Sequence, residues 1–393
     1  MRFALNLARE IDRRMAHYCS DRRAVLVNSR TAMNYAVVRP IYEAMRGDRR
    51  VQFSFTANEQ PGRLADIYRE ADRHARLLHP RLAMLKRFDA YLTADLLWPR
   101  LPRGARRILM FHGVAGKYAN IYDSPDRSMR DWDRLFFINE RRLRNFIKSG
   151  AIDCDSRAAR LVGYPKLDCL VDGTLNRTAI LESLGIDPAR RIVLYAPTWS
   201  PYSSLNAMGE TLVERLGAAG FAVIVKLHDR SRDPEYIHSG GVDWAGRLQP
   251  LLRACGGRLA DASDASPYLA AADVLVTDHS SVGFEYLLVD RPLIRIEMPQ
   301  LIAATNIHPE YVALMAEAAT SVRTADEAVR AVERAFSEPA KKSVERCAVA
   351  GQLFYKPGTA TARAVRELYD AIELEPIPTP VAAPQPAALR AES

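Results

Sequence analysis

The sequence predicts an α/β protein built from two successive domains, each with a parallel sheet covered by helices. A chain of 393 residues is too long for one ordinary core. Short apolar runs bounded by polar turns recur along it, and segments with helical periodicity separate several of them. Near residues 173–190 a helix, a glycine cap and a proline turn indicate a crossing between domains. We expect an N-terminal domain over 1–172, a C-terminal domain over 173–375 and a disordered Pro- and Ala-rich tail over 376–393.

Each apolar run predicts one strand. The first half of the chain has six runs, at 24–28, 51–55, 90–94, 107–113, 134–140 and 160–165. The second half has five, at 192–199, 221–228, 257–260, 274–278 and 292–297. Helical periodicity predicts helices over 63–78, 140–150, 210–220 and 360–375. This alternation favours parallel strands with crossover helices on both faces.

Composition places the chain among ordinary globular proteins, with 48% hydrophobic and 26% charged residues. There is no run of 18 apolar residues, so we expect no membrane-spanning helix. The first 15 residues lack the apolar core of a secretory signal. The five cysteines are widely spaced and fit no zinc pattern, which indicates a reducing compartment. We therefore expect a cytoplasmic protein.

The net charge of +8 is unevenly distributed, with +13 in residues 1–172 and −5 in residues 173–393. A basic half of this kind attracts phosphate-rich partners, such as anionic lipid or a polyanionic polymer. A solvated Arg-rich surface explains the same numbers. No nucleic-acid-binding module is recognisable, so we expect no nucleic-acid partner.

The most informative segment is 272–294, where a strand ends in Asp278 and a polar turn before an amphipathic stretch. A helix that begins at Ser280 and Ser281 would direct free backbone N–H groups and two hydroxyls at an anion. Glu285, about one turn later, could accept hydrogen bonds from sugar hydroxyls. The segment therefore predicts a site for a nucleotide-linked phosphate, with an ordinary helix cap as the alternative.

Three other polar turns follow predicted strands. His112 precedes Gly113, Gly116 and Lys117, and a histidine there could take a proton from an attacking hydroxyl. Thr198 lies beyond a proline turn. His228 has Lys226 and Arg230 nearby and could stabilise a departing phosphate. Each histidine could instead cap or pack, but turns at the carboxyl ends of strands in both domains would face one cleft.

Other chemistries lack support in the sequence. The triplets 131–133 and 153–155 have the Asp-x-Asp pattern, but neither follows an obvious buried strand, so we expect no metal. There is no phosphate-binding P-loop and no Gly-x-Gly-x-x-Gly after a strand. The serine pair lacks the flanking glycines of a nucleophile elbow, which argues against a serine hydrolase.

Five motifs carry a family resemblance, namely FHGVAGK, VGYPKLD, VLYAPTW, VIVKLHDR and ADVLVTDHSSVGFEYLLVDRPLI. In this order, over roughly residues 85–300, they resemble the CDP-glycerol glycerophosphotransferase family of teichoic-acid-type polymer synthesis. The resemblance implies a GT-B fold, in which two Rossmann-like domains face each other across a cleft and the second binds most of the donor nucleotide. It implies no essential metal or other cofactor.

The resemblance also implies roles for individual residues. His112 would be the general base on the acceptor hydroxyl, and His228 would stabilise the donor pyrophosphate or the leaving CMP. Ser280 and Ser281 would hold donor phosphate and Glu285 the ribose hydroxyls. The remaining matches are Thr198, Lys226 and Asp278 on the donor side, and Gly113 and Lys117 on the acceptor side. Two positions depart from the family pattern: Asp229 replaces a proline and His279 replaces an aromatic residue.

The function this implies is transfer of glycerol phosphate, or a related polyol phosphate, from a CDP-linked donor. The acceptor would be a hydroxyl of a cell-surface glycan or lipid-linked polymer, and the enzyme could associate with the anionic inner face of the membrane. Two alternatives stay open. One is a nucleotide-sugar glycosyltransferase or UDP-sugar 2-epimerase of the same fold, and the other is a non-catalytic nucleotide- or polymer-binding protein.

Overall fold

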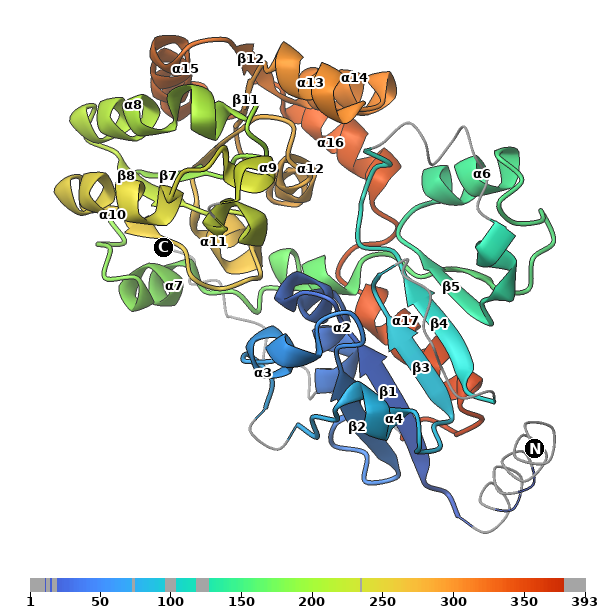
Figure 1. Ribbon diagram of the computed structural model, residues 1–393. Helices are drawn as coiled ribbons and strands as arrows, with labels where there is room; N and C mark the ends of the chain where they lie inside the picture. Colours follow the sequence, from blue (N-terminus) through green and yellow to red (C-terminus); the bar gives the residue numbers. More distant parts are fainter. Residues whose placement is uncertain are drawn as a thin grey trace, which may run out of the picture.

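The protein consists of two lobes, each built on a six-stranded parallel sheet (Figure 1). The computed structural model describes residues 11, 15, 20–72, 75–95, 104–117, 127–233 and 235–377. Two sheets with crossover helices confirm the predicted α/β class and its GT-B-like arrangement. The tail expected over 376–393 lies outside the described residues from 378 onward.

The first sheet has the strand order β2-β1-β3-β4-β5-β6. Every pair of neighbours is parallel. The side chains of β3 are buried on both faces because helices cover both sides of the sheet. The strands are β1 (Arg23–Asn28), β2 (Val51–Thr56), β3 (Ala90–Thr93), β4 (Arg106–Met110), β5 (Arg134–Phe137) and β6 (Ala159–Leu161).

Capping side chains mark the start of α2 and α6 in this lobe. Thr31 and Asn34 form a reciprocal capping box at the start of α2. Asn139 caps α6 by accepting a hydrogen bond from the Arg142 backbone N–H at 2.8 Å. The helices are α2 (Ala32–Met45), α3 (Leu64–Ile67), α4 (Pro80–Ala83) and α6 (Glu140–Lys148), with 3₁₀ turns η1 (Pro61–Arg63), η2 (Arg127–Asp131) and η3 (Pro165–Leu170).

The second sheet has the order β12-β11-β10-β7-β8-β9, again with parallel neighbours. Apolar side chains fill its central strands, and all four residues of β7, β8 and β10 are buried. The strands are β7 (Ile192–Tyr195), β8 (Ala222–Val225), β9 (Arg258–Leu259), β10 (Val274–Thr277), β11 (Leu293–Ile296) and β12 (Thr320–Val322).

Helices surround the second sheet, with α8, α10 and α15 packed together over one face. The helices from α7 onward are α7 (Arg177–Ser183), α8 (Ser204–Ala218), α9 (Tyr236–Ser239), α10 (Trp244–Ala254), α11 (Ser266–Ala271), α12 (Val282–Glu285), α13 (Pro299–Thr305), α14 (Pro309–Ala318), α15 (Ala325–Ser337), α16 (Ser343–Leu353) and α17 (Ala360–Ala371). The 3₁₀ turns are η4 (Asp229–Arg232) and η5 (Tyr286–Val289). In the described part of the chain, no helix combines the length and apolar character needed to cross a bilayer.

One predicted helix is wrong. The segment 63–78 was expected to be helical throughout, but its helix ends at Ile67 and the chain becomes extended further on. There Phe55 of β2 donates a backbone hydrogen bond to Arg76 and accepts one from Leu78, both at 2.8 Å. Pairing with the edge of the sheet therefore overrides the local helical pattern.

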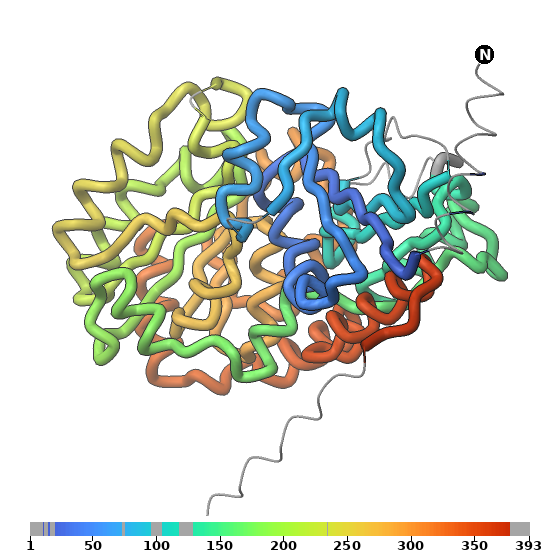
Figure 2. The backbone as a smooth tube through the Cα atoms, turned by 90° about the horizontal axis from the view of Figure 1, so that it is seen from below, coloured from blue at the N-terminus to red at the C-terminus, as the bar shows by residue number. Residues whose placement is uncertain are grey.

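The last helix returns to the first lobe. Asp168 in η3 accepts hydrogen bonds from the backbone N–H groups of Ala360 and Thr361, at 3.1 and 2.6 Å, and so caps α17. The helix packs on α2, and its end is held where Arg23 donates to the Ile372 carbonyl at 2.8 Å. Figure 2 shows this red segment beside the blue N-terminal strand. One hydrophobic cluster therefore extends through both lobes.

Candidate active site

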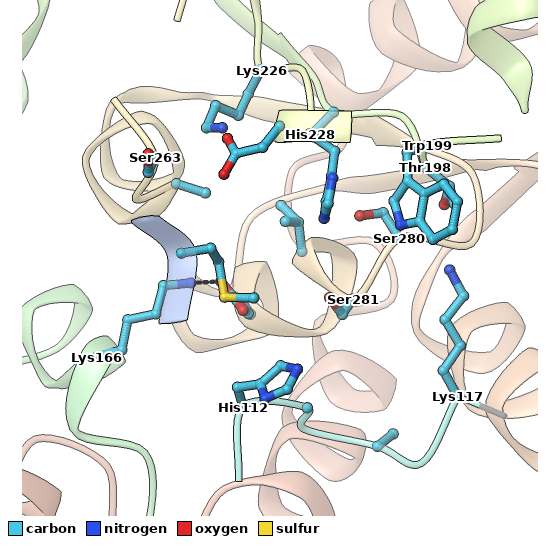
Figure 3. Close-up of a pocket in the computed structure, with 18 of the residues that line it drawn as sticks. His112, Lys117, Lys166, Thr198, Trp199, Lys226, His228, Ser263, Ser280 and Ser281 are labelled. Atoms are coloured by element: carbon cyan, nitrogen blue, oxygen red, sulfur yellow. Dashed lines mark hydrogen bonds and ion pairs between the residues drawn. The ribbon is translucent and has the colours of Figure 1, made fainter. Parts of the chain in front are cut away.

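A cavity of about 380 Å³ lies between the lobes, where the carboxyl ends of strands from both sheets meet. Figure 3 shows side chains of both lobes entering it. Nine of the ten residues that the sequence predicts for the site line this cavity. These nine are His112, Gly113, Lys117, Thr198, Lys226, His228, Ser280, Ser281 and Glu285.

His112 follows β4 and is half-buried in the wall of the first lobe. Its Nδ1 contacts the backbone carbonyl oxygen of Ala94. A carbonyl can only accept, so Nδ1 carries the proton and the lone pair of the neutral ring lies on Nε2. Burial lowers the pKa of His112, with a smaller opposing effect from Asp95. The ring is therefore neutral at pH 7, with a basic Nε2.

His228 follows β8 and exposes its ring to the cavity from the second lobe. The backbone N–H of Arg230 donates to its Nδ1 at 3.1 Å. The proton of the neutral ring must therefore lie on Nε2. The surrounding protein lowers the pKa of His228 well below its usual range, and the cations Lys226 and Arg230 lower it further. Without a bound anion, His228 is thus a neutral hydrogen-bond donor.

The two histidines therefore differ in chemistry because backbone groups fix opposite tautomers. Figure 3 shows His112 and His228 entering the cavity from opposite sides, with Ser281 between them. One ring offers a lone pair that can accept a proton, and the other offers an N–H that can stabilise negative charge. This pairing suits a reaction in which a hydroxyl attacks an anionic centre.

The serine pair begins a helix, as predicted, but the helix is short. Ser281 is the cap residue of α12, which has only four residues before the 3₁₀ turn η5. A helix of one turn has only a small macrodipole, so its free N–H groups and hydroxyls are the groups that can hold an anion. Among the described residues, none bonds the hydroxyl of Ser280 or Ser281, or accepts from their backbone N–H groups. These four donors remain available to a ligand.

Cations flank these donors. Lys226 is buried and donates to the Leu227 carbonyl at 2.9 Å, and burial lowers its pKa to about 8. Lys117 comes from the first lobe, but its ammonium group points toward Thr198 and Ser280 of the second (Figure 3). Burial lowers the pKa of Lys117 to about 8 as well. The hydroxyl of Thr198 is buried without a partner among the described residues, which suits a ligand oxygen.

Asp278 is the predicted residue that does not line the cavity. It is fully buried, and its carboxylate accepts from the backbone N–H groups of Thr198 and Ser204 at 2.8 and 3.1 Å. It also accepts from the Ser204 hydroxyl at 2.9 Å. These donors lie in the turn after β7 and at the first residue of α8. Asp278 therefore stabilises that turn from the protein side. It does not line the cavity, so it offers no direct contact to a bound donor nucleotide.

Several lining residues were missed by sequence reasoning. Lys166 forms a buried ion pair with Glu285, with 2.7 Å between Nζ and Oε2. The neighbouring Tyr164 donates from its hydroxyl to the His112 backbone carbonyl at 3.1 Å. Arg142 donates to the Gly113 carbonyl at 2.6 Å. Both Lys166 and Tyr164 belong to the VGYPKLD motif, so the signal was present, but nothing in it revealed their partners.

Trp199 forms another part of the wall and was also missed. The guanidinium of Arg230 lies 4.2 Å from its ring centroid, and His238 packs against it at 5.8 Å. His238, Asp233 and Glu235 have ligand atoms within 4.8 Å of one another. They do not line the cavity, and a hydrogen bond of 3.1 Å between His238 and Asp233 accounts for part of this proximity. We assign no function to this group.

His279 directly precedes the serine pair and is fully buried, and neither of its ring nitrogens has a partner among the described residues. Burial lowers its pKa to about 4. We expect His279→Phe to raise the free energy of unfolding by about 1–2 kcal/mol at pH 7, because it removes desolvated polar atoms. His279→Leu is the control for side-chain volume. Urea titrations measure the change.

The same variant tests pH dependence. The unfolded chain takes up a proton at His279 near pH 6.5, whereas the folded protein does so only near pH 4. The neutral folded form therefore loses stability as the pH falls through this window. The free energy of unfolding of His279→Phe should therefore fall less steeply between pH 6.5 and 4.5 than that of the wild-type protein. A steeper decline, or a less stable protein at pH 7, would contradict this account of the ring.

Comparison with known proteins places this geometry in a family. Residues 111–370 match the model for CDP-glycerol:poly(glycerophosphate) glycerophosphotransferases. A teichoic acid poly(glycerol phosphate) polymerase of Staphylococcus epidermidis is 25% identical over 179 residues, which is 42% of this chain and 23% of that protein. A second such polymerase, from Bacillus spizizenii, is 25% identical over 222 residues, which is 50% of this chain and 53% of that protein. The matched segments thus span about a quarter of the first relative's length and about half of the second's.

Solved structures support the same fold. The wall teichoic acid polymerase TagF superposes with a TM-score of 0.68 at 14% identity, covering 94% of this chain and 98% of that one. The Staphylococcus aureus MnaA–UDP structure superposes less closely, with a TM-score of 0.56 at 12% identity and coverage of 90% and 98%. The family match covers the whole second sheet and strands β5 and β6 of the first, and it includes every residue of the cavity from His112 to Glu285. The chain belongs to the CDP-glycerol:poly(glycerophosphate) glycerophosphotransferase family.

Proposed function

We propose that the protein transfers a polyol-phosphate group, glycerol phosphate first, from a CDP-linked donor to a hydroxyl acceptor. The observation that carries this proposal is the pair of histidines with opposite tautomers, which face each other across a cavity rich in anion donors. The curated relatives are named poly(glycerol phosphate) polymerases, and a TagF variant was soaked with CDPG. The proposed acceptor is accordingly the terminal hydroxyl of a cell-surface or lipid-linked polymer.

In the proposed reaction, His112 Nε2 removes the proton of the acceptor hydroxyl. The oxygen attacks the β-phosphorus, and the bond from that phosphorus to the bridging oxygen breaks. CMP leaves with the bonding electrons on that oxygen. The Nε2–H of His228 donates to a phosphate oxygen as the charge builds up.

The donor binds mainly to the second lobe in this proposal. Ser280 and Ser281 hold phosphate oxygens through hydroxyls and backbone N–H groups, and Thr198 adds a hydroxyl. Lys117 and Lys226 supply positive charge. We therefore assign Lys117 to the donor phosphates, because its ammonium group points to that side of the cavity (Figure 3).

Incubation with CDP-glycerol and CDP-ribitol, with glycerol-phosphate oligomers as acceptors and CMP release as the readout, tests the reaction. Acceptor-dependent CMP release supports it. Calorimetry with CMP and UDP separates this proposal from the alternative functions. Tight UDP binding without CMP binding would favour a nucleotide-sugar enzyme. CMP binding without release from any CDP-polyol favours a binding protein.

The two lysines predict how donor affinity depends on pH. Because burial lowers both pKa values to about 8, Lys117 and Lys226 lose their charge as the pH rises through that value. We expect the Kd for CMP to increase several-fold between pH 7 and pH 9.5, measured by calorimetry. Cytidine, which lacks the phosphate, is the control and should bind equally at both pH values.

We further propose that the first lobe docks on the anionic inner face of the cell membrane. Around α4, four apolar side chains are exposed, namely Leu77, Leu82, Met84 and Leu85, by 40%, 53%, 38% and 77%. Residues 75–88 also contain four Lys or Arg and no acidic residue. Apolar insertion next to positive charge is the chemistry of peripheral binding to anionic lipid.

Vesicle sedimentation tests this docking. The protein should pellet with vesicles containing phosphatidylglycerol, less so with neutral ones, and less at high salt. Leu82→Ser/Leu85→Ser should lose binding several-fold, whereas Val344→Ser, at a residue 81% exposed in the other lobe, should not. Equal pelleting by the double variant would contradict the proposal.

A further inference from the structure

The ammonium group of Lys166 is buried between two carboxylates of the second lobe. The side chain is only 5% exposed, and its Nζ lies 2.7 Å from Glu285 Oε2 and 4.0 Å from Asp264 Oδ1. Lys166 itself belongs to η3, which follows the last strand of the first sheet. A first-lobe cation therefore neutralises the carboxylate to which the family resemblance assigns the donor ribose.

A second first-lobe cation completes the network. Arg39 of α2 lies 3.4 Å from the other oxygen of Asp264 and 3.2 Å from Glu70. Glu70 in turn accepts from the backbone N–H of Ser263 at 3.0 Å. Ser263 lines the cavity beside Lys226 (Figure 3). The network thus holds the donor side of the cavity against the first lobe.

The ion pair compensates the burial of Glu285. The residue is 4% exposed, and a carboxylate buried to this degree is costly unless a cation pairs with it. The carboxylates raise the pKa of Lys166, so the pair stays charged. Asp264 and Tyr164 also act on this pair, and Lys226 lies within electrostatic reach. An ionised carboxylate is the stronger acceptor for a hydroxyl.

We propose that Lys166 is a positioning residue, which holds the Glu285 carboxylate in place so that the site selects donors with an intact ribose. The inference rests on the proposed function, because it assumes that a cytidine nucleotide binds in this cavity. It adds that recognition of the sugar depends on a residue of the opposite lobe.

Calorimetry with CMP and 2′,3′-dideoxy-CMP tests the inference. The wild-type protein should prefer CMP at pH 7 by about tenfold or more, the effect of a hydrogen bond to a charged group. Lys166→Met should lose most of this preference, because the ion pair no longer holds the Glu285 carboxylate in place. Glu285→Gln should lose it as well, and Lys166→Arg, which keeps the cation, should retain it. The ratio of the two affinities cancels the contacts that both ligands share.

A structural role alone would not produce this pattern. Arg160→Met, which breaks a 2.7 Å ion pair with Glu367 away from the cavity, is the matched control and should keep the preference. If Lys166→Met does not fold, the double variant Lys166→Met/Glu285→Gln removes both charges, and its preference should equal that of Glu285→Gln alone.

The two failures are distinguishable. If the wild-type protein binds no cytidine nucleotide, the proposed function falls. If it binds CMP and discriminates against the dideoxy form, but Lys166→Met discriminates equally at pH 7, the inference falls while the proposed function stands.

Discussion

The variant His112→Ala should lose a factor of about 10²–10⁴ in kcat, the usual contribution of a positioned general base. The reason is the tautomer: the Ala94 carbonyl fixes the Nδ1 proton, so only Nε2 can accept the proton of the acceptor hydroxyl. Alanine offers no base, and water in a partly closed cavity is a poor substitute. Initial rates of CMP release from CDP-glycerol measure the loss.

Donor binding is the internal control for this variant. His112 lies on the first-lobe wall, whereas the proposed donor contacts lie mainly on the second, so the Kd for CMP should change less than threefold. A variant with near-normal kcat would refute the role as base. A variant that loses CMP binding and turnover together would show that His112 supports the fold of the site instead.

The variant His228→Ala should lower kcat/KM by about 10²–10³, the cost of removing one positioned donor from developing charge. The Arg230 N–H bond leaves Nε2–H as the group that faces the cavity. Because the lowered pKa makes the ring neutral without a ligand, we expect the stabilisation to come from hydrogen bonding rather than from a pre-existing imidazolium. Steady-state kinetics with CDP-glycerol measure it.

Two variants separate this role from a local structural one. His228→Asn can still accept the Arg230 N–H but cannot reach the phosphates, so it should be as defective as His228→Ala. His79 accepts the backbone N–H of Arg81 at 3.3 Å in the same way but does not line the cavity. His79→Ala should therefore retain activity. Full activity of His228→Asn would contradict the assignment.

Buried parallel strands leave continuous apolar runs, so the sequence predicts eleven of the twelve strands in the described residues. It misses the edge strand β12 (Thr320–Val322), which is only partly buried and has no such run. The runs at 24–28 and 274–278 correspond to β1 and β10 within one residue at each end. It also predicts the cavity, because polar residues directly after a strand must lie at the carboxyl edge. The predicted helix over 63–78 is wrong because residues 76 and 78 form backbone hydrogen bonds with Phe55 of β2. Local periodicity gives no sign of such a contact, because its partners lie more than 20 residues apart.

What the sequence could not provide is the partner of each polar group. Asp278 and Glu285 are both acidic residues beside the serine pair, yet one is enclosed by backbone donors and the other lines the cavity. Likewise, nothing in the VGYPKLD motif indicates that Lys166 crosses to Glu285, 119 residues away. The return of α17 to the first lobe has no local signal either, because Asp168 caps a helix that begins 192 residues later.

A crystal structure with bound CMP tests the central claim most directly, namely that an activated cytidine diphosphate lies between the two histidines. We expect the phosphate to contact the Ser280 and Ser281 hydroxyls and His228 Nε2, with the ribose against Glu285 and His112 Nε2 left open to an acceptor. A phosphate bound outside this cavity, or one that occupies His112 Nε2, would contradict the account.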